Sequence, residues 1–506
     1  MQDVLIVGAG PTGLVLALWL TRLGIRVRIV SKASGPGTTS RAMAVQARTL
    51  ELYRQLDLTD AVIAAGHRNP AINLWAEGRR RARIGFGEAG ATLTPYPFVL
   101  IYPQDQHERL LVERLQALGI SVEWQTELLE VTEAGGQVGA RLRGPDGSEE
   151  TCTARALAGC DGARSLVRQQ IGAGFPGETY RQIFYVADVE VRGLAPDGEI
   201  HLSLATSDFV ALIAYGQGGR YRLIGTVRDD RIEDPDHLTF EDVGHHAVAA
   251  LSVGVAAVHW FSTYRVHHRV TDRFRRGRVF LLGDAAHVHS PVGGQGMNTG
   301  LGDAINLAWK LAAVVKRQAP DSLLDTYETE RRAFARTLVA TTDRIFGVVT
   351  AEGRIADLVR TRIAPSLMGA AYRLAAVRKR LFRLVSQTAL TYHDSPLSQG
   401  VAGTVRGGDR LPWIAIGGTD NHAPLTAIAW QVHVYGRAAP ELRDACASRN
   451  IPLHVFDWHS EYGRAGLARD AAYLLRPDTY VALADPRASA DTLARYLDAR
   501  GLMRPA

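Results

Sequence analysis

The apolar and polar positions of the N-terminal segment predict a strand, a glycine turn, a helix and a second strand. Residues 4–7 are all apolar, as in a short buried strand. A glycine-rich turn follows at once, and the apolar residues after it predict a helix to about Leu23. Ile25, Val27 and Ile29 then alternate with arginines, which is typical of a strand. This order is that of a parallel βαβ unit.

A second apolar run begins at Val279. Residues 279–282 predict another buried strand, so Asp284 lies near its carboxyl end, where open α/β sheets bind their ligands. Glycines in the loop beyond, at 293, 294 and 296, allow backbone to approach a ligand closely. The loop leads into a predicted helix with apolar residues at helical spacing: Leu301, Ile305, Ala308 and Ala312.

The remaining chain alternates strand and helix patterns. Predicted strands cover residues 185–191, 209–215, 221–227, 431–435 and 452–456. Between them, residues 351–386 have an arginine-rich helical pattern. The sequence therefore predicts an α/β protein with a β-rich middle.

Composition excludes several classes of protein. With 506 residues, 46% of them hydrophobic, the chain is long enough for about two to four domains. The net charge of +6 is small and the basic residues are scattered, so we expect no nucleic-acid partner. No uninterrupted apolar run reaches about twenty residues, which predicts no membrane span. Cys152, Cys160 and Cys446 have no metal or redox spacing; this predicts no metal site and a reducing, cytoplasmic location.

The first glycine turn carries a recognisable chemistry. In a strand–turn–helix unit, Gly8 makes the tight bend, Gly10 admits a pyrophosphate, and Gly13 allows close packing of helix on strand. Pro11 and Thr12 complete this segment. The pattern in this context predicts dinucleotide binding.

One position departs from that fingerprint. The second strand of such units usually ends in an acidic residue that holds the ribose. Here Ser31 occupies that position and Lys32 follows it. A serine cannot accept from two hydroxyls as a carboxylate does, so we expect weaker binding of the adenosine end.

The segment around Asp284 adds a carboxylate and a helix N-terminus. The carboxylate suits hydroxyl groups, and the free N–H groups at the start of the helix suit negative charge. This combination is what a flavin requires when it becomes anionic on reduction.

Three motifs together resemble the FAD-dependent aromatic hydroxylases, which are single-component flavoprotein monooxygenases similar to p-hydroxybenzoate hydroxylase. They are GAGPTG at 8–13, GCDGARS at 159–165 and GDAAHVHSPVGGQGMNTGLGDA at 283–304. The match covers roughly residues 3–345. It implies FAD as cofactor, with NADPH or NADH bound transiently, and the chain has no second strand–GxGxxG–helix unit for the nicotinamide nucleotide.

The resemblance implies a role for individual residues. Arg41 resembles an arginine near the FAD pyrophosphate, and Gln104 and Asp284 resemble residues on the ribityl chain. Asp161 resembles an acid linked to both FAD and NAD(P)H. The cofactor-binding set is completed by Gly8, Gly10, Pro11, Thr12, Gly13, Ser31, Lys32, Gly294, Gly296, Met297 and Asn298.

Three of the loop positions are expected to act in catalysis. The backbone N–H groups of Met297 and Asn298 match those that meet the pyrimidine end of the flavin. Pro291 matches a proline whose carbonyl faces the flavin–oxygen adduct. For the general base expected on a phenol, Tyr215, His201, His287 and His289 are open alternatives, with ordinary packing favoured for each.

The resemblance also implies a domain organisation. Residues 1–75, 99–176 and 270–350 form a Rossmann-like FAD-binding domain, and residues 76–98 and 177–269 form an inserted β-sheet substrate domain. Residues 351–398 connect to a C-terminal domain at 399–506 that resembles the thioredoxin-like terminus of phenol and polyketide hydroxylases. Only Cys446 falls in that domain, so we expect it to be redox-inactive.

The implied function is hydroxylation of a phenolic or polycyclic aromatic through a flavin hydroperoxide, with NAD(P)H and dioxygen as co-substrates. The predicted strand at 209–215 carries no arginine for an aromatic acid, which favours a neutral or bulky phenol. An epoxidase or Baeyer–Villiger enzyme, a flavin oxidase or reductase, a non-catalytic FAD-binding protein and a nucleic-acid binder are the alternatives. We expect a monomer or homodimer.

Overall fold

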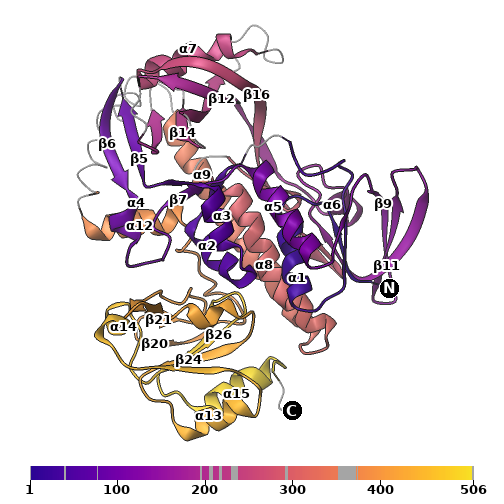
Figure 1. Ribbon diagram of the computed structural model, residues 1–506. Helices are drawn as coiled ribbons and strands as arrows, with labels where there is room; N and C mark the ends of the chain where they lie inside the picture. The colour runs from indigo at the N-terminus through magenta and orange to yellow at the C-terminus, as the bar shows by residue number, and fades with distance from the viewer. Residues whose placement is uncertain are drawn as a thin grey trace.

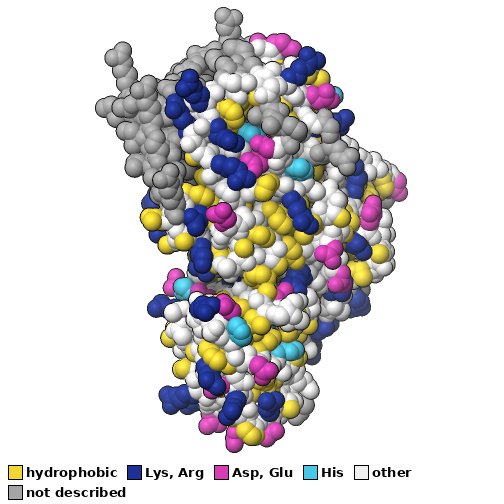
Figure 2. Space-filling view, turned by 60° about the vertical axis from the view of Figure 1, so that its left-hand side comes forward, with side chains coloured by type: hydrophobic (Ala, Val, Ile, Leu, Met, Phe, Trp, Pro, Cys, Tyr) yellow, Lys and Arg dark blue, Asp and Glu magenta, His cyan; other side chains and the backbone are white. Residues whose placement is uncertain are grey.

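The computed structural model describes residues 2–38, 42–76, 78–193, 197–203, 209–215, 219–228, 238–290, 294–350, 372 and 374–503. Figure 1 shows three parts: a central body, a sheet at one end that includes β12 and β16, and a C-terminal domain at the other end. Basic and acidic side chains are interspersed on the face shown in Figure 2. Among the described helices, none combines the length and apolar character that crossing a bilayer requires.

The central body is built on a sheet with the order β17-β18-β11-β1-β2-β8. Four neighbouring pairs, from β18 through to β8, are parallel. The strands are β1 (Gln2–Val7), β2 (Val27–Val30), β8 (Val122–Glu123), β11 (Glu149–Gly159), β17 (Arg275–Arg276) and β18 (Val279–Leu281). A hairpin of β9 (Glu127–Ala134) and β10 (Gln137–Arg143) extends β11.

Three helices pack together in this body: α1 (Pro11–Arg22), α5 (Gln104–Ala117) and α8 (Gly296–Val315). Every residue of α1 from 13 to 20 is buried, which explains its continuous apolar sequence. The predicted strand–turn–helix–strand unit is confirmed, although the second strand begins at Val27 rather than Ile25. Shorter elements here are α2 (Ala47–Tyr53), α3 (Thr59–Ala65), α6 (Leu166–Gln170) and a small sheet of β3 (Ala44–Val45), β7 (Val99–Ile101) and β4 (His67–Asn69).

The second sheet has the order β19-β16-β12-β15-β14-β13-β5-β6. Its strands are β5 (Ala71–Ala76), β6 (Arg79–Gly85), β12 (Gly177–Arg192), β13 (Ile200–Ser203), β14 (Val210–Ala214), β15 (Arg220–Arg228), β16 (Gly254–Val270) and β19 (His287–Val288). The three strands predicted in the middle of the chain are therefore confirmed. Strand β5 belongs to this sheet although it begins at Ala71, before residue 76, where the substrate domain is predicted to begin.

The two faces of this sheet differ in what covers them. Leu212 and Leu223 pack in one cluster with Val243 of α7 (Phe240–Leu251). Successive side chains on a strand point to opposite faces. Ile213 accordingly lies on the other face, where it packs with Met43 of the central body.

The C-terminal domain has a six-stranded sheet in the order β21-β20-β27-β26-β24-β25. Strand β24 is parallel to β25 and antiparallel to β26, and helices α13 and α15 complete a thioredoxin-like arrangement. The elements are β20 (Gln399–Ala402), β21 (Val405–Arg406), β24 (Gln431–Tyr435), α13 (Pro440–Ala447), β25 (Leu453–Phe456), α14 (Ser460–Arg464), β26 (Ala472–Leu475), β27 (Val481–Asp485) and α15 (Ala490–Ala499). Both strands predicted here are confirmed.

Two further helices join the parts: α9 (Asp325–Thr350) and α12 (Ala375–Val385), which packs against α4 (Phe86–Gly90). Most of the helical segment predicted at 351–386 lies outside the described residues; α12 confirms its last part.

Buried charges connect the C-terminal domain to the central body. Arg410 donates to Glu51 of α2 at 2.8 Å, and Arg48 donates to the Asp478 carbonyl at 3.0 Å. Arg476 donates to both carboxylate oxygens of Glu330 on α9, at 2.7 and 2.9 Å. Burial alone would raise the pKa of Glu51, but Arg410 and Arg48 lower it to about 2.

The Glu51 pairing predicts a pH-dependent stability. A carboxyl with a lowered pKa in the folded protein stabilises the fold above its unfolded value of 4.5, and this contribution is lost as pH falls towards 2. Glu51→Gln leaves two guanidinium groups without their buried partner and should cost about 3 kcal/mol at pH 7. Thermal unfolding from pH 7 to pH 3 checks this, with the exposed Glu130→Gln as control. The wild type and the control should lose more stability on acidification than Glu51→Gln; equal losses would contradict the assignment.

Candidate functional site

The three sequence motifs meet at one edge of the central sheet. Because β1, β2, β11 and β18 are parallel, their carboxyl ends lie at the same edge. Gly8, Ser31, Asp161 and Asp284 each follow one of these ends within three residues. The structure thus brings together residues that lie far apart in the sequence.

The glycines of the first motif have separate roles. Gly8 has φ 107°, and a Cβ on it would overlap the Cys160 carbonyl; a Cβ on Gly13 would overlap the Gly8 carbonyl. A Cβ on Gly10 would meet nothing within 4 Å. Gly8 and Gly13 are therefore required by the protein's own packing, whereas the space at Gly10 is open to a ligand.

The start of α1 suits an anion. Gly10 is its N-cap residue, Pro11 occupies the first turn, and no side chain caps the free N–H groups. No acidic residue lies in that turn. Thr12 turns its side chain towards Gly283, where an added Cβ would lie 2.8 Å from the Thr12 hydroxyl. Thr12 therefore joins the first motif to the third, while the backbone of the turn fits a pyrophosphate.

Ser31 is buried and its hydroxyl accepts from the Ala33 N–H at 3.3 Å, whereas Lys32 is exposed. The serine therefore stabilises its own turn. A carboxylate that could hold a ribose is absent from this position, as the sequence indicated.

Gln104 donates to Glu108 at 2.8 Å, and Glu108 accepts from the Gly37 N–H at 2.7 Å. Glu108 is buried and connects α5 to the turn after β2. The Gln104 N–H donates to the Ala42 carbonyl, so Gln104 lies beside the segment that carries Arg41. Arg41 itself lies outside the described residues.

The middle motif holds Asp161 with one oxygen free. Its Oδ2 accepts from the Val167 N–H at 3.1 Å, while its buried Oδ1 has no partner among the described residues. Arg168 donates to the carbonyls of Ala163 and Ala285, at 2.7 and 2.9 Å, and so links the middle motif to the third. An orphaned acceptor at this edge fits a hydroxyl-bearing ligand.

Asp284 is solvent-accessible, yet the protein around it is dense enough to raise its pKa by desolvation. This combination fits a carboxylate that a bound ligand would cover.

Asp303 of α8 is a residue of this site that the sequence motifs did not predict. Its fully buried carboxylate accepts from the Gly283 N–H at 3.0 Å, from Arg331 at 2.6 Å, and lies 2.7 Å from His287 Nε2. Burial would raise the pKa of Asp303, but Arg331 and His287 lower it overall. The sequence carries no periodic signal for this role, because Asp303 lies on the helix face opposite to Leu301 and Ile305.

At the start of α8, Gly296 and Met297 belong to the first helical turn rather than to the loop. The Asn298 side chain accepts from the Gln46 N–H and the Thr49 hydroxyl, and it donates to the carbonyls of Ala44 and Gly294, at 2.8–3.0 Å. Only its backbone N–H is left for a ligand. Pro291 lies outside the described residues.

The four candidate bases separate by position. His287 is buried and hydrogen-bonded to Asp303. His201 lies on the sheet face that α7 covers, where it accepts from the Trp75 indole N–H and is hydrogen-bonded to Asp197. Desolvation and the neighbouring Asp188 raise the pKa of Tyr215 to about 12, so it stays protonated at neutral pH. His289 lies near the start of α8: its Nε2 is 3.8 Å from the position of a Cβ on Gly296.

The three motifs at this edge, with the second sheet beside them, agree with the class of flavin-dependent monooxygenases, and the comparisons with known proteins show that class. The family model for the FAD binding domain matches residues 1–342, and the chain belongs to that family. It is an FAD-dependent aromatic hydroxylase by fold and by relatives. The described residues hold no group of His, Cys, Asp or Glu side chains arranged to bind a metal.

Individual relatives agree. A 6-methylpretetramide 4-monooxygenase of Streptomyces rimosus is 40% identical over 401 residues, which cover 79% of this chain and 71% of that protein. The OxyS anhydrotetracycline hydroxylase from Streptomyces rimosus has a TM-score of 0.79 and 28% identity, with 100% of both chains covered. An aklavinone-11 hydroxylase in complex with FAD and aklavinone has a TM-score of 0.79, 27% identity and 99% coverage of both chains.

The open space at Gly10 predicts a selective loss of FAD binding. Gly10→Ala should leave the thermal stability of the apoprotein within about 2 °C of the wild type, because the backbone is extended and the added methyl meets no atom. FAD binding, measured by flavin fluorescence, should weaken at least about tenfold. Gly13→Ala is the matched comparison and should destabilise the fold itself. Unchanged FAD affinity in Gly10→Ala would exclude the pyrophosphate from this turn.

The departure at Ser31 predicts the opposite effect. Ser31→Glu restores a carboxylate at the end of β2 and should tighten FAD binding about tenfold, the worth of a charged hydrogen bond. Ser31→Ala should change it little, since the hydroxyl is engaged with Ala33. A calorimetric titration of the apoprotein with FAD distinguishes these; no gain in Ser31→Glu would mean that the ribose lies elsewhere.

Proposed function

We propose that the protein hydroxylates a neutral phenolic or polycyclic aromatic substrate with NAD(P)H and dioxygen. The observation that carries the proposal is that the three motifs meet at one sheet edge, together with the start of α8. When bound there, FAD would supply electron transfer from NAD(P)H and the activation of dioxygen. The remaining work falls to the protein's own residues.

We assign those residues as follows. The turn at Gly10 and Arg41 hold the pyrophosphate, and Gln104 and Asp284 hold the ribityl chain. Asp161 offers its free oxygen beside the nucleotide. The N–H groups of Met297 and Asn298 would meet the pyrimidine end of FAD, and Pro291, which lies outside the described residues, keeps the role that the resemblance implies.

Helix α8 supplies charge stabilisation. It is 20 residues long, and its first N–H groups have no partner within the helix. The aligned peptide dipoles place about half a positive charge at this end. Negative charge that develops on the flavin is therefore stabilised by groups that need no rearrangement.

The inner face of the second sheet favours an uncharged substrate. Arg222 is paired across the strands with Ile213 and with Asp188, so it lies on the face opposite α7. Its guanidinium is buried and donates twice to Asp188, both at 2.8 Å. Because Asp188 neutralises this arginine, it is a poor anchor for an aromatic acid. The relative that acts on 6-methylpretetramide supports an aromatic substrate of the polyketide type.

We also propose the domain division given by the sequence, with the substrate domain extended to include β5. In the C-terminal domain Cys446 is buried near the end of α13, and burial raises its pKa to about 11. A thiol that stays protonated is a poor nucleophile, which supports a structural role for this domain.

Stopped-flow absorbance of the reduced, FAD-loaded protein mixed with dioxygen tests the proposed function. A transient hydroperoxide spectrum that decays faster with one neutral phenol, together with hydroxylated product, is expected. Aromatic acids of similar size serve as the comparison and should have no such effect. Direct return to oxidised flavin with hydrogen peroxide under all conditions would favour an oxidase or reductase, and oxygen insertion beside a carbonyl or across a double bond would favour the other monooxygenase classes.

A further inference from the structure

The segment that leaves α12 contacts the first turn of α8. Gln295, the N-cap residue of α8, donates to the Val385 carbonyl at 3.0 Å. Gln387 Nε2 donates to Gln295 Oε1 at 2.6 Å and to the Thr299 hydroxyl at 3.4 Å. Met297 and Asn298 lie between these two contacts, so Gln387 holds both ends of the turn that carries their N–H groups.

Gln387 adopts a backbone conformation that a glutamine rarely takes. Its φ is +59°, in the left-handed region, and the residue is 9% exposed. Such a conformation costs about 1 kcal/mol or more and persists only where the surrounding structure fixes it. With this backbone conformation, the buried amide of Gln387 reaches the N-terminal turn of α8.

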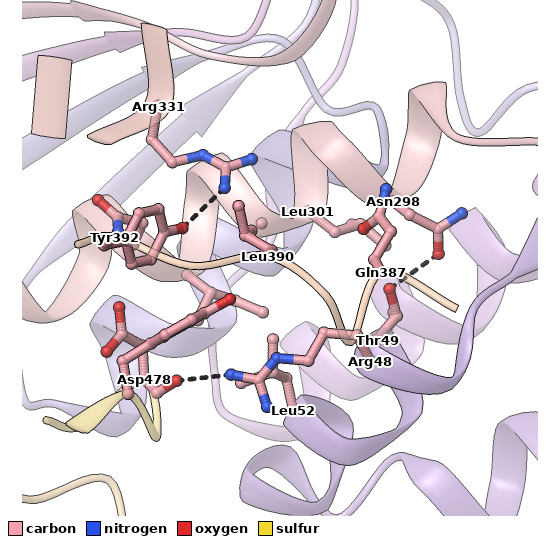
Figure 3. A pocket seen from close by; sticks show the side chains of 14 residues that line it. Arg48, Thr49, Leu52, Asn298, Leu301, Arg331, Gln387, Leu390, Tyr392 and Asp478 are labelled. Carbon is pink, nitrogen blue, oxygen red and sulfur yellow. Dashed lines mark hydrogen bonds between the residues drawn. The ribbon is translucent and has the colours of Figure 1, made fainter. Parts of the chain in front are cut away.

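The segment around Gln387 is anchored from the C-terminal domain. The Ser386 carbonyl accepts from the Arg48 N–H at 3.1 Å, and the Arg48 guanidinium donates to the Asp478 carbonyl and the Thr479 hydroxyl. Figure 3 shows Arg48, Gln387 and Asn298 around a cavity between α2, α8 and the turn at Asp478.

That cavity is too small to allow the side chains around it to move far. Its volume is about 20 Å³, room for about one water molecule. On its far side Arg331 donates to the Tyr392 hydroxyl at 2.8 Å and to the Thr299 carbonyl at 3.0 Å. The first turn of α8 is thus held from two directions by residues outside the predicted FAD site.

We propose that Gln387 is a positioning residue for the flavin: by holding Gln295 and Thr299 it aims the N–H groups of Met297 and Asn298, and it makes FAD binding depend on the C-terminal domain. This inference rests on the proposed function, because it places the pyrimidine end of FAD at this helix terminus. A loosened turn stabilises both forms of the flavin less well, and the anionic reduced form loses more than the neutral oxidised form. Both the affinity for FAD and its midpoint potential should therefore fall.

Two substitutions at Gln387 and one control test the proposal in the full-length, FAD-loaded protein. Gln387→Leu removes the amide. Gln387→Asn suits the left-handed backbone better than glutamine does, but its side chain is one methylene too short to reach Gln295. Gln55→Leu is the control: Gln55 is also buried and donates to the Pro477 carbonyl at 2.8 Å across the same interface, and its side chain has no hydrogen bond to α8 among the described residues.

The readouts are the dissociation constant of oxidised FAD by fluorescence, the midpoint potential by dye equilibration, and the thermal midpoint. Both Gln387 variants should bind FAD about five-fold more weakly, the scale of a helix-terminus interaction, and show a lower potential. Gln55→Leu should lower only the thermal midpoint. Gln387→Asn with the FAD affinity and potential of the wild type would overturn the proposal, as would equal changes in Gln55→Leu. Failure of the wild type to bind FAD would instead overturn the proposed function, and this inference with it.

Discussion

The buried carboxylate of Asp303 is the constraint on which the candidate site depends. One of its oxygens accepts from the Gly283 N–H and contacts His287, and the other accepts from Arg331. The same side chain therefore fixes the strand end that carries Asp284, the helix that carries Met297, and α9. A buried charge left without its partner costs about 3–5 kcal/mol, so these elements are stable only in this relative arrangement.

The arrangement places rigid elements where a flavin needs them. The first motif packs so tightly on the second that no side chain fits at Gly8 or Gly13, whereas Gly10 faces open space. Thr12 lies against Gly283 of the third motif. The backbone groups that would meet the pyrophosphate and the pyrimidine ring are held by packing rather than by flexible side chains, which keeps them oriented before any ligand arrives.

The sequence predicted the elements whose signals are local. Glycine spacing and apolar periodicity located β1, α1, β18 and α8, and the serine in place of an acid at position 31 was visible directly. Asp303, Gln387 and the pairing of Arg222 with Asp188 could not be predicted in this way, since each depends on contacts between residues at least 15 positions apart. A buried ion pair has no periodic signature, and a glutamine in a left-handed turn has none either. The same holds for the register of β12 with β15 and β16, which places Arg222 on the inner face.

A crystal structure of the protein with FAD bound is the most direct test of the FAD site. It should show the pyrophosphate against the turn at Gly10, the ribityl chain within hydrogen-bond distance of Asp284, and the pyrimidine end facing the N–H groups of Met297 and Asn298. Density for FAD at another edge of the sheet, or a flavin ring remote from the start of α8, would contradict this placement.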